Sequence, residues 1–180
     1  MGALHGPAWA AAGDQAGFEI NVLGTQNILE GAREHGVQRV VWTSSIWATG
    51  HAPLPPPYLP IDEELPRRPV ELYGLTKALG EQMCRFATER YGLSTICLRS
   101  GGICAPDASL QRRFGHLFGT VDVRDAAQAH ALAVRLDDSI GHDVFVIAAD
   151  SPLCEVAPTR FFADPKGVLE DLYPGIGELL

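Results

Sequence analysis

The chain has 180 residues, which is enough for one domain with its own hydrophobic core, and we expect residues 1–180 to form a single domain. Its formal net charge of -8 argues against nucleic acid or an anionic membrane as a partner, because an acidic surface repels a polyanion. No apolar run approaches the roughly 18 residues that span a bilayer, and no basic segment followed by an apolar stretch marks a secretory signal, so we expect a cytoplasmic protein.

The first part of the chain is predicted to alternate helix, strand and loop. Residues 1–12 carry no clear pattern, whereas apolar residues at helical spacing predict a helix over 14–35 that the following Gly36 ends. A short apolar run over 39–44 predicts a buried strand. Prolines recur between residues 51 and 69, and they predict a loop because they exclude a helix interior and a central strand.

The rest of the chain repeats this alternation. Apolar positions every three or four residues predict a long helix over 71–91, and a strand is predicted over 94–99. A helix over 123–136 and a strand over 144–148 follow, and the tail over 159–180 has a weaker helical pattern that prolines interrupt. Strands that alternate with helices indicate an α/β fold with a parallel sheet covered by helices.

Tyr73 and Lys77 lie four residues apart on the predicted helix, so both side chains face the same side. A tyrosine hydroxyl has an ordinary pKa of about 10 and is a poor base at neutral pH. A nearby ammonium favours the phenolate and lowers that pKa, so the pair is suited to moving a proton on or off an alcohol hydroxyl. The motif alone is weak, because such pairs occur by chance on many exposed helices.

Other polar or flexible positions follow the predicted strands. Ser45 comes directly after the first strand, and Gly101 and Gly102 follow the second. Ligands of open α/β sheets bind beyond the carboxyl ends of the strands. A serine hydroxyl there can hydrogen-bond a substrate oxygen, and glycines let the backbone approach a flat ligand closely. The combined order of strand, serine, proline-rich loop and Tyr-x-x-x-Lys helix therefore favours an enzyme.

Several segments together resemble the extended short-chain dehydrogenase/reductases of the NAD-dependent epimerase/dehydratase family. The segments are residues 21–27, 40–45, 73–81, 98–102 and 121–125. The resemblance implies a partial Rossmann-like, doubly wound parallel sheet, the cofactor NAD or NADP, and a sugar or sugar-acid-like substrate. It also implies that Ser45 is a catalytic hydroxyl that touches substrate, that Tyr73 is the acid/base, and that Lys77 lowers the pKa of Tyr73 and holds the nicotinamide ribose.

The same resemblance assigns further contacts. Asn21 matches a family asparagine near the cofactor, and Gly101 matches the segment that faces the nicotinamide. The stretch over 107–120 is short, whereas relatives that act on nucleotide-sugars carry a long insertion there, so it resembles compact members such as uronate dehydrogenases. Arg124, or an arginine within the short stretch, would then meet a substrate carboxylate. The alternative for each of these arginines is a solvated basic face.

The family's Gly-x-x-Gly-x-x-Gly phosphate loop has no counterpart in this sequence. Residues 1–7 resemble the segment just after the family's fourth strand, so we expect an internal strand to form a bare edge. We expect an oxidoreductase or epimerase if the missing segment is supplied. The alternatives are a catalytically inactive remnant or interaction module, and a dinucleotide-binding redox sensor. A bare edge also offers a route to a homodimer.

Some residues have plainer interpretations. The four cysteines include no CxxC pair and the histidines no HExxH motif, so we expect no metal and buried, reduced thiols. Asp122 is expected to cap the helix that follows it. Glu81, one turn beyond Lys77, is expected to form at most a weak surface pair with it. Trp42 is expected to be a packing residue, and Trp47 follows Ser45 closely enough to line a pocket.

Overall fold

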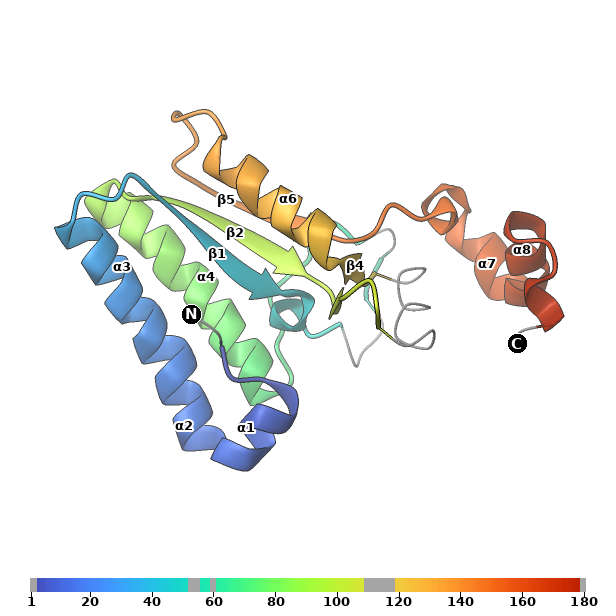
Figure 1. Cartoon of the computed structure of the whole chain (residues 1–180), viewed down its shortest axis with the longest axis horizontal. Helices are drawn as coiled ribbons and strands as arrows, with labels where there is room; N and C mark the ends of the chain where they lie inside the picture. Colours follow the sequence, from blue (N-terminus) through green and yellow to red (C-terminus); the bar gives the residue numbers. More distant parts are fainter. Residues whose placement is uncertain (1–2, 52–55, 59–60, 109–118, 179–180) are drawn as a thin grey trace.

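The computed structural model describes residues 3–51, 56–58, 61–108 and 119–178 (Figure 1). Its centre is a parallel sheet in the order β1-β2-β5. The strands are β1 (Arg39–Ser45), β2 (Ser94–Ser100) and β5 (His142–Ile147). All three were predicted within two residues of their observed ends, and the α/β class with a parallel sheet is confirmed.

Helices cover both faces of this sheet (Figure 1). The helices α3 (Gly24–Glu34) and α4 (Leu72–Tyr91) pack on one face, where Cys84 and Cys97 lie in a shared apolar cluster. The helix α6 (Val123–Val134) packs on the other face against Ile96 and Leu98. Neighbouring residues of β2 therefore point to opposite layers, as expected for a strand buried on both faces.

The helix predicted over 14–35 is a composite. It consists of α2 (Asp14–Phe18), the π-helical segment η1 (Glu19–Leu23) and α3. Gly36 follows with a φ of 68°, a left-handed conformation that ends a helix and favours glycine. The expected run is thus continuous, but it contains one wide turn.

A helix that was not predicted precedes this run. The helix α1 spans Gly6–Ala12, and it docks through Trp9, whose indole ring lies against the Cα of Gly17. A side chain at position 17 would overlap that ring, so the glycine permits the contact. Trp9 Nε1 also donates to Asp14 Oδ1 at 2.8 Å. Alanine-rich sequence gives little periodicity, which explains why residues 1–12 looked unpatterned.

The helix α4 buries a different side from the one its large apolar residues suggest. Leu72, Leu75 and Phe86 are all exposed, whereas small and polar residues face the sheet. The buried positions are Gly74, Thr76, Lys77, Ala78, Gly80, Glu81, Cys84 and Ala87. Small side chains allow the helix to approach the strands closely, and a side chain at Gly80 would overlap the Trp42 ring.

Short elements complete the described chain. The 3-10 turn η2 (Ile46–Thr49) follows β1, and two short parallel strands, β3 (Ile103–Cys104) and β4 (Val121–Asp122), lead into α6. As predicted, Asp122 caps α6 by accepting the backbone N–H of Arg124. Strands of two residues carry no periodic signal, so β3 and β4 were not predicted.

The C-terminal tail folds into short helices that stand away from the sheet (Figure 1). They are η4 (Pro152–Glu155), α7 (Pro158–Ala163), α8 (Pro165–Leu172) and η5 (Ile176–Glu178). The predicted break at Pro165 is confirmed, because α7 ends before it and Asp164 caps α8. The tail packs chiefly on itself around Val168 and Leu169.

One expectation about the cysteines is wrong. Cys84, Cys97 and Cys104 are buried, but Cys154 lies exposed in η4. Within the described residues no group of histidine, cysteine or acidic side chains is arranged to hold a metal ion. No helix in the described part of the chain is long and apolar enough to cross a membrane.

Candidate functional site

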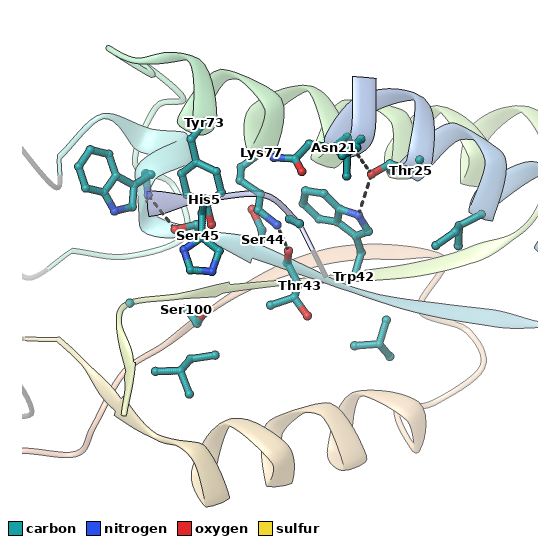
Figure 2. A pocket seen from close by; sticks show the side chains of 18 of the residues that line it. His5, Asn21, Thr25, Trp42, Thr43, Ser44, Ser45, Tyr73, Lys77 and Ser100 are labelled. Carbon is teal, nitrogen blue, oxygen red and sulfur yellow. Dashed lines mark hydrogen bonds between the residues drawn. The ribbon is translucent and has the colours of Figure 1, made fainter. Parts of the chain in front are cut away.

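A groove of about 750 Å³ opens where β1 ends. Its walls come from the N-terminal segment, from η1 and α3, from β1, from the first turns of α4 and from the loop after β2. Ser45, Tyr73 and Lys77 all line it, and Figure 2 shows Tyr73 and Lys77 descending from α4 toward the end of β1. The structure therefore brings the three predicted catalytic side chains into one groove.

The first turn of α4 places Tyr73 next to Ser45. The Glu71 carboxylate caps the helix and accepts the backbone N–H groups of Tyr73, at 2.8 Å, and of Gly74. Gly74 lies against the carbonyl of Trp47 so closely that a side chain would overlap it. This close approach presses α4 onto η2, whose N-cap is Ser45.

The phenol of Tyr73 is half-buried, and its surroundings act on its pKa in opposite directions. Burial raises the pKa of Tyr73 above its ordinary value, a hydrogen bond with the Ser45 side chain lowers it, and the charge of Glu71 raises it. The net shift is upward, so the phenol is protonated at neutral pH. The rings of His5 and Trp9, at centroid distances of 5.9 and 6.4 Å, flank Tyr73 and were not predicted at this site.

Lys77 is buried with its ammonium group near two aromatic rings. Its Nζ donates to the Thr43 carbonyl at 2.8 Å, and lies 4.7 Å from the Trp42 ring centroid and 5.7 Å from that of Tyr73. Burial lowers the pKa of Lys77 from 10.5 to about 8. Trp42, expected to be a packing residue, thus also provides a cation–π contact to the lysine.

Asn21 and Gly101 also line the groove, but each has a contact within the chain. Asn21 is buried in the π-helical turn, where it exchanges hydrogen bonds of 2.8 and 3.0 Å with the backbone of Leu4 and donates to Thr76 Oγ1 at 3.1 Å. A side chain at Gly101 would overlap the carbonyl of Gly119. Asn21 therefore attaches the N-terminal segment to α4, and Gly101 permits a close backbone crossing.

Arg124, one of the predicted substrate arginines, lies outside the groove. Arg124 is at the start of α6, where it pairs with Asp122 at 2.8 Å and its side chain remains 76% exposed. It is not among the residues that line the groove. Arg112 and Arg113, the arginines of the short stretch, lie outside the described residues.

The expectation for Glu81 is wrong. Instead of pairing with Lys77 at the surface, its side chain is fully buried and forms ion pairs with Arg99 and Arg67. No local pattern indicates this network, because the arginines are 18 and 14 residues away along the chain.

The groove continues along the outer edge of β1. Among the described residues no strand pairs with this edge, since β1 pairs only with β2. The backbone N–H of Ser94 donates to the carbonyl of residue 38, so that carbonyl faces β2. Carbonyl groups alternate in direction along a strand, so the carbonyl of Thr43 faces the outer edge, where Lys77 donates to it. Ile20, Gly24 and Ile28 form the opposite wall. A bare edge of this kind was predicted.

Comparisons with known proteins point to one family. Residues 1–118 match the sequence profile described as the NAD dependent epimerase/dehydratase family. The uronate dehydrogenase of Pseudomonas syringae pv. tomato is 42% identical over 81 residues, which are 45% of this chain and 28% of that protein. The UDP-glucose 4-epimerase of Halalkalibacterium halodurans is 29% identical over 124 residues, which are 69% of this chain and 33% of that protein.

A solved structure agrees with these matches. A short-chain dehydrogenase/reductase superfamily protein from Agrobacterium tumefaciens with bound NAD is similar with a TM-score of 0.70 at 26% identity, over 93% of this chain and 64% of that one. The chain spans about a third or less of the length of the two curated relatives. The profile match over residues 1–118 and the shared fold show that the chain belongs to the NAD-dependent epimerase/dehydratase family.

Proposed function

We propose that this chain provides part of an NAD(P)-dependent oxidoreductase or epimerase that acts on a sugar or sugar-acid-like substrate. The observation that carries the proposal is the convergence of Ser45, Tyr73 and Lys77 in one groove. Two of the similar proteins, a uronate dehydrogenase and a UDP-glucose 4-epimerase, are named for such substrates, which supports the substrate class.

The chain's own residues would handle the proton. The Ser45 hydroxyl and the Tyr73 phenol line the same groove, so both can contact one substrate oxygen, and Tyr73 would exchange its proton with that oxygen. Lys77 places a positive charge close to the phenol. Its ammonium has three N–H donors, so it can donate to a ligand hydroxyl as well as to the Thr43 carbonyl. NAD or NADP, when bound, supplies the hydride acceptor or donor.

The residues that line the groove suit the nicotinamide end of that cofactor. Lys77 and Asn21 offer polar groups to a nicotinamide ribose, and the loop at Gly101 borders the same space. No Gly-x-x-Gly-x-x-Gly loop is present to hold the pyrophosphate. We therefore propose that full affinity requires a segment that supplies this loop.

The competing function is an inactive remnant or an interaction module of the same fold. The bare edge of β1 favours it, because an unpaired strand edge is a ready template for another chain, including a second copy of this one. A homodimer and a cytoplasmic location remain predictions.

Calorimetric titration of the purified chain with NAD and with NADP separates the two functions. Saturable binding, even if weaker than that of an enzyme with the phosphate loop, supports the enzyme, whereas no binding at any cofactor concentration by a chain with a folded circular dichroism spectrum supports the remnant. Where turnover of a uronate is measurable at 340 nm, Tyr73→Phe should lower it by about 100-fold or more, because general acid/base catalysis contributes that much. Tyr91→Phe, at an exposed tyrosine far along α4, is the matched control and should leave turnover unchanged.

A further inference from the structure

An ion-pair network centred on a fully buried carboxylate lies directly behind the groove. The Glu81 carboxylate accepts hydrogen bonds from Arg99 Nε and Nη2 at 2.9 Å each, from Ser44 Oγ at 2.6 Å and from Arg67 Nε at 2.5 Å. Burial alone would raise the pKa of Glu81, but the hydrogen bonds from Arg99, Ser44 and Arg67 lower it overall, so the carboxylate is ionised. Each of its oxygens is satisfied, as a buried charge requires.

The donors in this network come from three separate segments of the chain. Ser44 belongs to β1, Arg99 to β2, and Arg67 to the segment over 61–68 within the proline-rich loop. Arg99 also donates directly to that segment, to the carbonyl of Glu63 at 3.2 Å. A single carboxylate on α4 therefore fixes two strands and a loop relative to the helix that carries Tyr73 and Lys77.

The network also supports the turn that presents Ser45. Ser44 directly precedes Ser45, and the carbonyl of Arg68, next to Arg67, lies against Gly50 so closely that a side chain there would overlap it. Gly50 caps η2 with a φ of 79°. Displacing Arg67 would thus disturb η2 at its C-terminal end, while Ser45 caps its N-terminal end by accepting the N–H of Trp47 at 3.3 Å.

We propose that Glu81 and Arg67 are positioning residues that hold the Ser45 hydroxyl against the Tyr73 phenol. Hydrophobic residues of similar volume can stabilise a core as well as a buried ion pair does, whereas charged hydrogen bonds fix the direction of approach. The inference deepens the proposed function and rests on it for its catalytic meaning.

Titration of Tyr73 in the 180-residue chain tests the inference without cofactor or turnover. The tyrosines are labelled at ¹³Cζ, and Tyr73→Phe assigns the Tyr73 resonance. Because the Ser45 hydrogen bond lowers the pKa of Tyr73, Ser45→Ala should raise it. Arg67→Gln should also raise it, and the double variant should show no further rise, because both changes remove the same hydrogen bond. Arg67→Lys, which keeps a cation, should restore part of the wild-type value.

Two features keep the test decisive. Arg67 is 30% exposed and its loss leaves Arg99 on Glu81, so the variant is expected to fold. At neutral pH, Arg67→Gln should also speed hydrogen exchange of the Gly50 amide, which donates to Trp47, by about tenfold. Arg39→Gln is the matched control, because Arg39 binds carbonyl groups after α6 at the other end of the sheet. It should leave both readouts unchanged.

Additive rises in the double variant, or an unchanged Tyr73 in Arg67→Gln where Ser45→Ala shifts it, would overturn the inference and leave the network a purely structural role. Absence of NAD binding would instead count against the proposed function, because neither readout depends on a cofactor. The two failures are therefore distinguishable.

Discussion

The two outer strands of the sheet, β1 and β5, differ in what covers their outer edges. Along β5, the Glu63 carboxylate accepts the N–H of Val146 at 2.9 Å, and the Glu63 carbonyl is bound by the buried Arg99. Along β1, no strand covers the outer edge within the described residues, and Lys77 binds the Thr43 carbonyl beside an open groove. The β5 edge is thus covered at Val146 by a carboxylate from a segment that the buried Arg99 holds in place, while the β1 edge is left accessible where the proposed chemistry takes place. The ion-pair network on Glu81 lies between the two edges and supports both.

The largest expected effect comes from breaking the buried network that holds the segment over 61–68 against the sheet. Glu81→Gln removes the charge that compensates Arg99 and should lower the free energy of unfolding by roughly 3–5 kcal/mol. Urea unfolding followed by circular dichroism measures this loss. Glu89→Gln, in an exposed pair with Arg85 on the same helix, is the control and should leave the midpoint unchanged. Equal midpoints for the two variants would contradict the assignment of stability to this network.

The pH dependence of stability tests the burial of Lys77 beside the open β1 edge. Burial lowers its pKa to about 8 in the folded chain, against an ordinary 10.5. Between these values the unfolded chain binds more protons, so this group's contribution to stability grows as pH rises and is lost as pH falls through about 8. Relative to Lys77→Met, the wild-type free energy of unfolding should increase by roughly 1.3 kcal/mol from about pH 7 to pH 9. A pH-independent difference between the two proteins would refute this.

A change at Glu63 tests the hydrogen bond that covers the β5 edge separately from the buried Glu81–Arg99 ion pair. Glu63→Ala removes the acceptor for the Val146 N–H but leaves Arg99 on Glu81, so the expected loss is roughly 1 kcal/mol. Urea unfolding gives the value, and hydrogen exchange of the Val146 amide should accelerate. If this amide exchanges at the wild-type rate, Glu63 does not protect the edge.

The smallest effect is expected for Arg124→Gln, which touches neither edge. Its exposed pair with Asp122 is easily replaced by water, and Asp122 still caps α6 through the backbone. The unfolding midpoint should not change. In an active enzyme, a raised KM for a sugar acid would instead show that Arg124 meets the substrate carboxylate.

Much of the fold followed from periodicity. The strands at 39–44 and 94–99 and the helix at 71–91 were predicted within a residue or two, because their apolar patterns are strong. The pattern located α4 but not its buried face: Leu75 and Phe86 are exposed, whereas Gly74 and Ala78 pack inward. A stripe of small residues would have been the better signal.

The candidate site was predictable only in part. Ser45, Tyr73 and Lys77 were picked out by motif order and do meet in one groove. The network on Glu81 could not be predicted, because its arginines come from a loop and a strand that only the tertiary fold brings together. Local spacing suggested that Glu81 pairs with Lys77, but its carboxylate binds the guanidinium groups of Arg67 and Arg99 instead.

The single wide turn at Glu19–Leu23 has a consequence for everything before it. A π turn contains about one residue more than an α turn, and one residue corresponds to about 100° of rotation around a helix axis. Deleting one residue there would swing α1 and its Trp9 to a different side of the molecule and separate Asn21 from Leu4. The rotational position of α1 relative to α3 thus depends on a single additional residue.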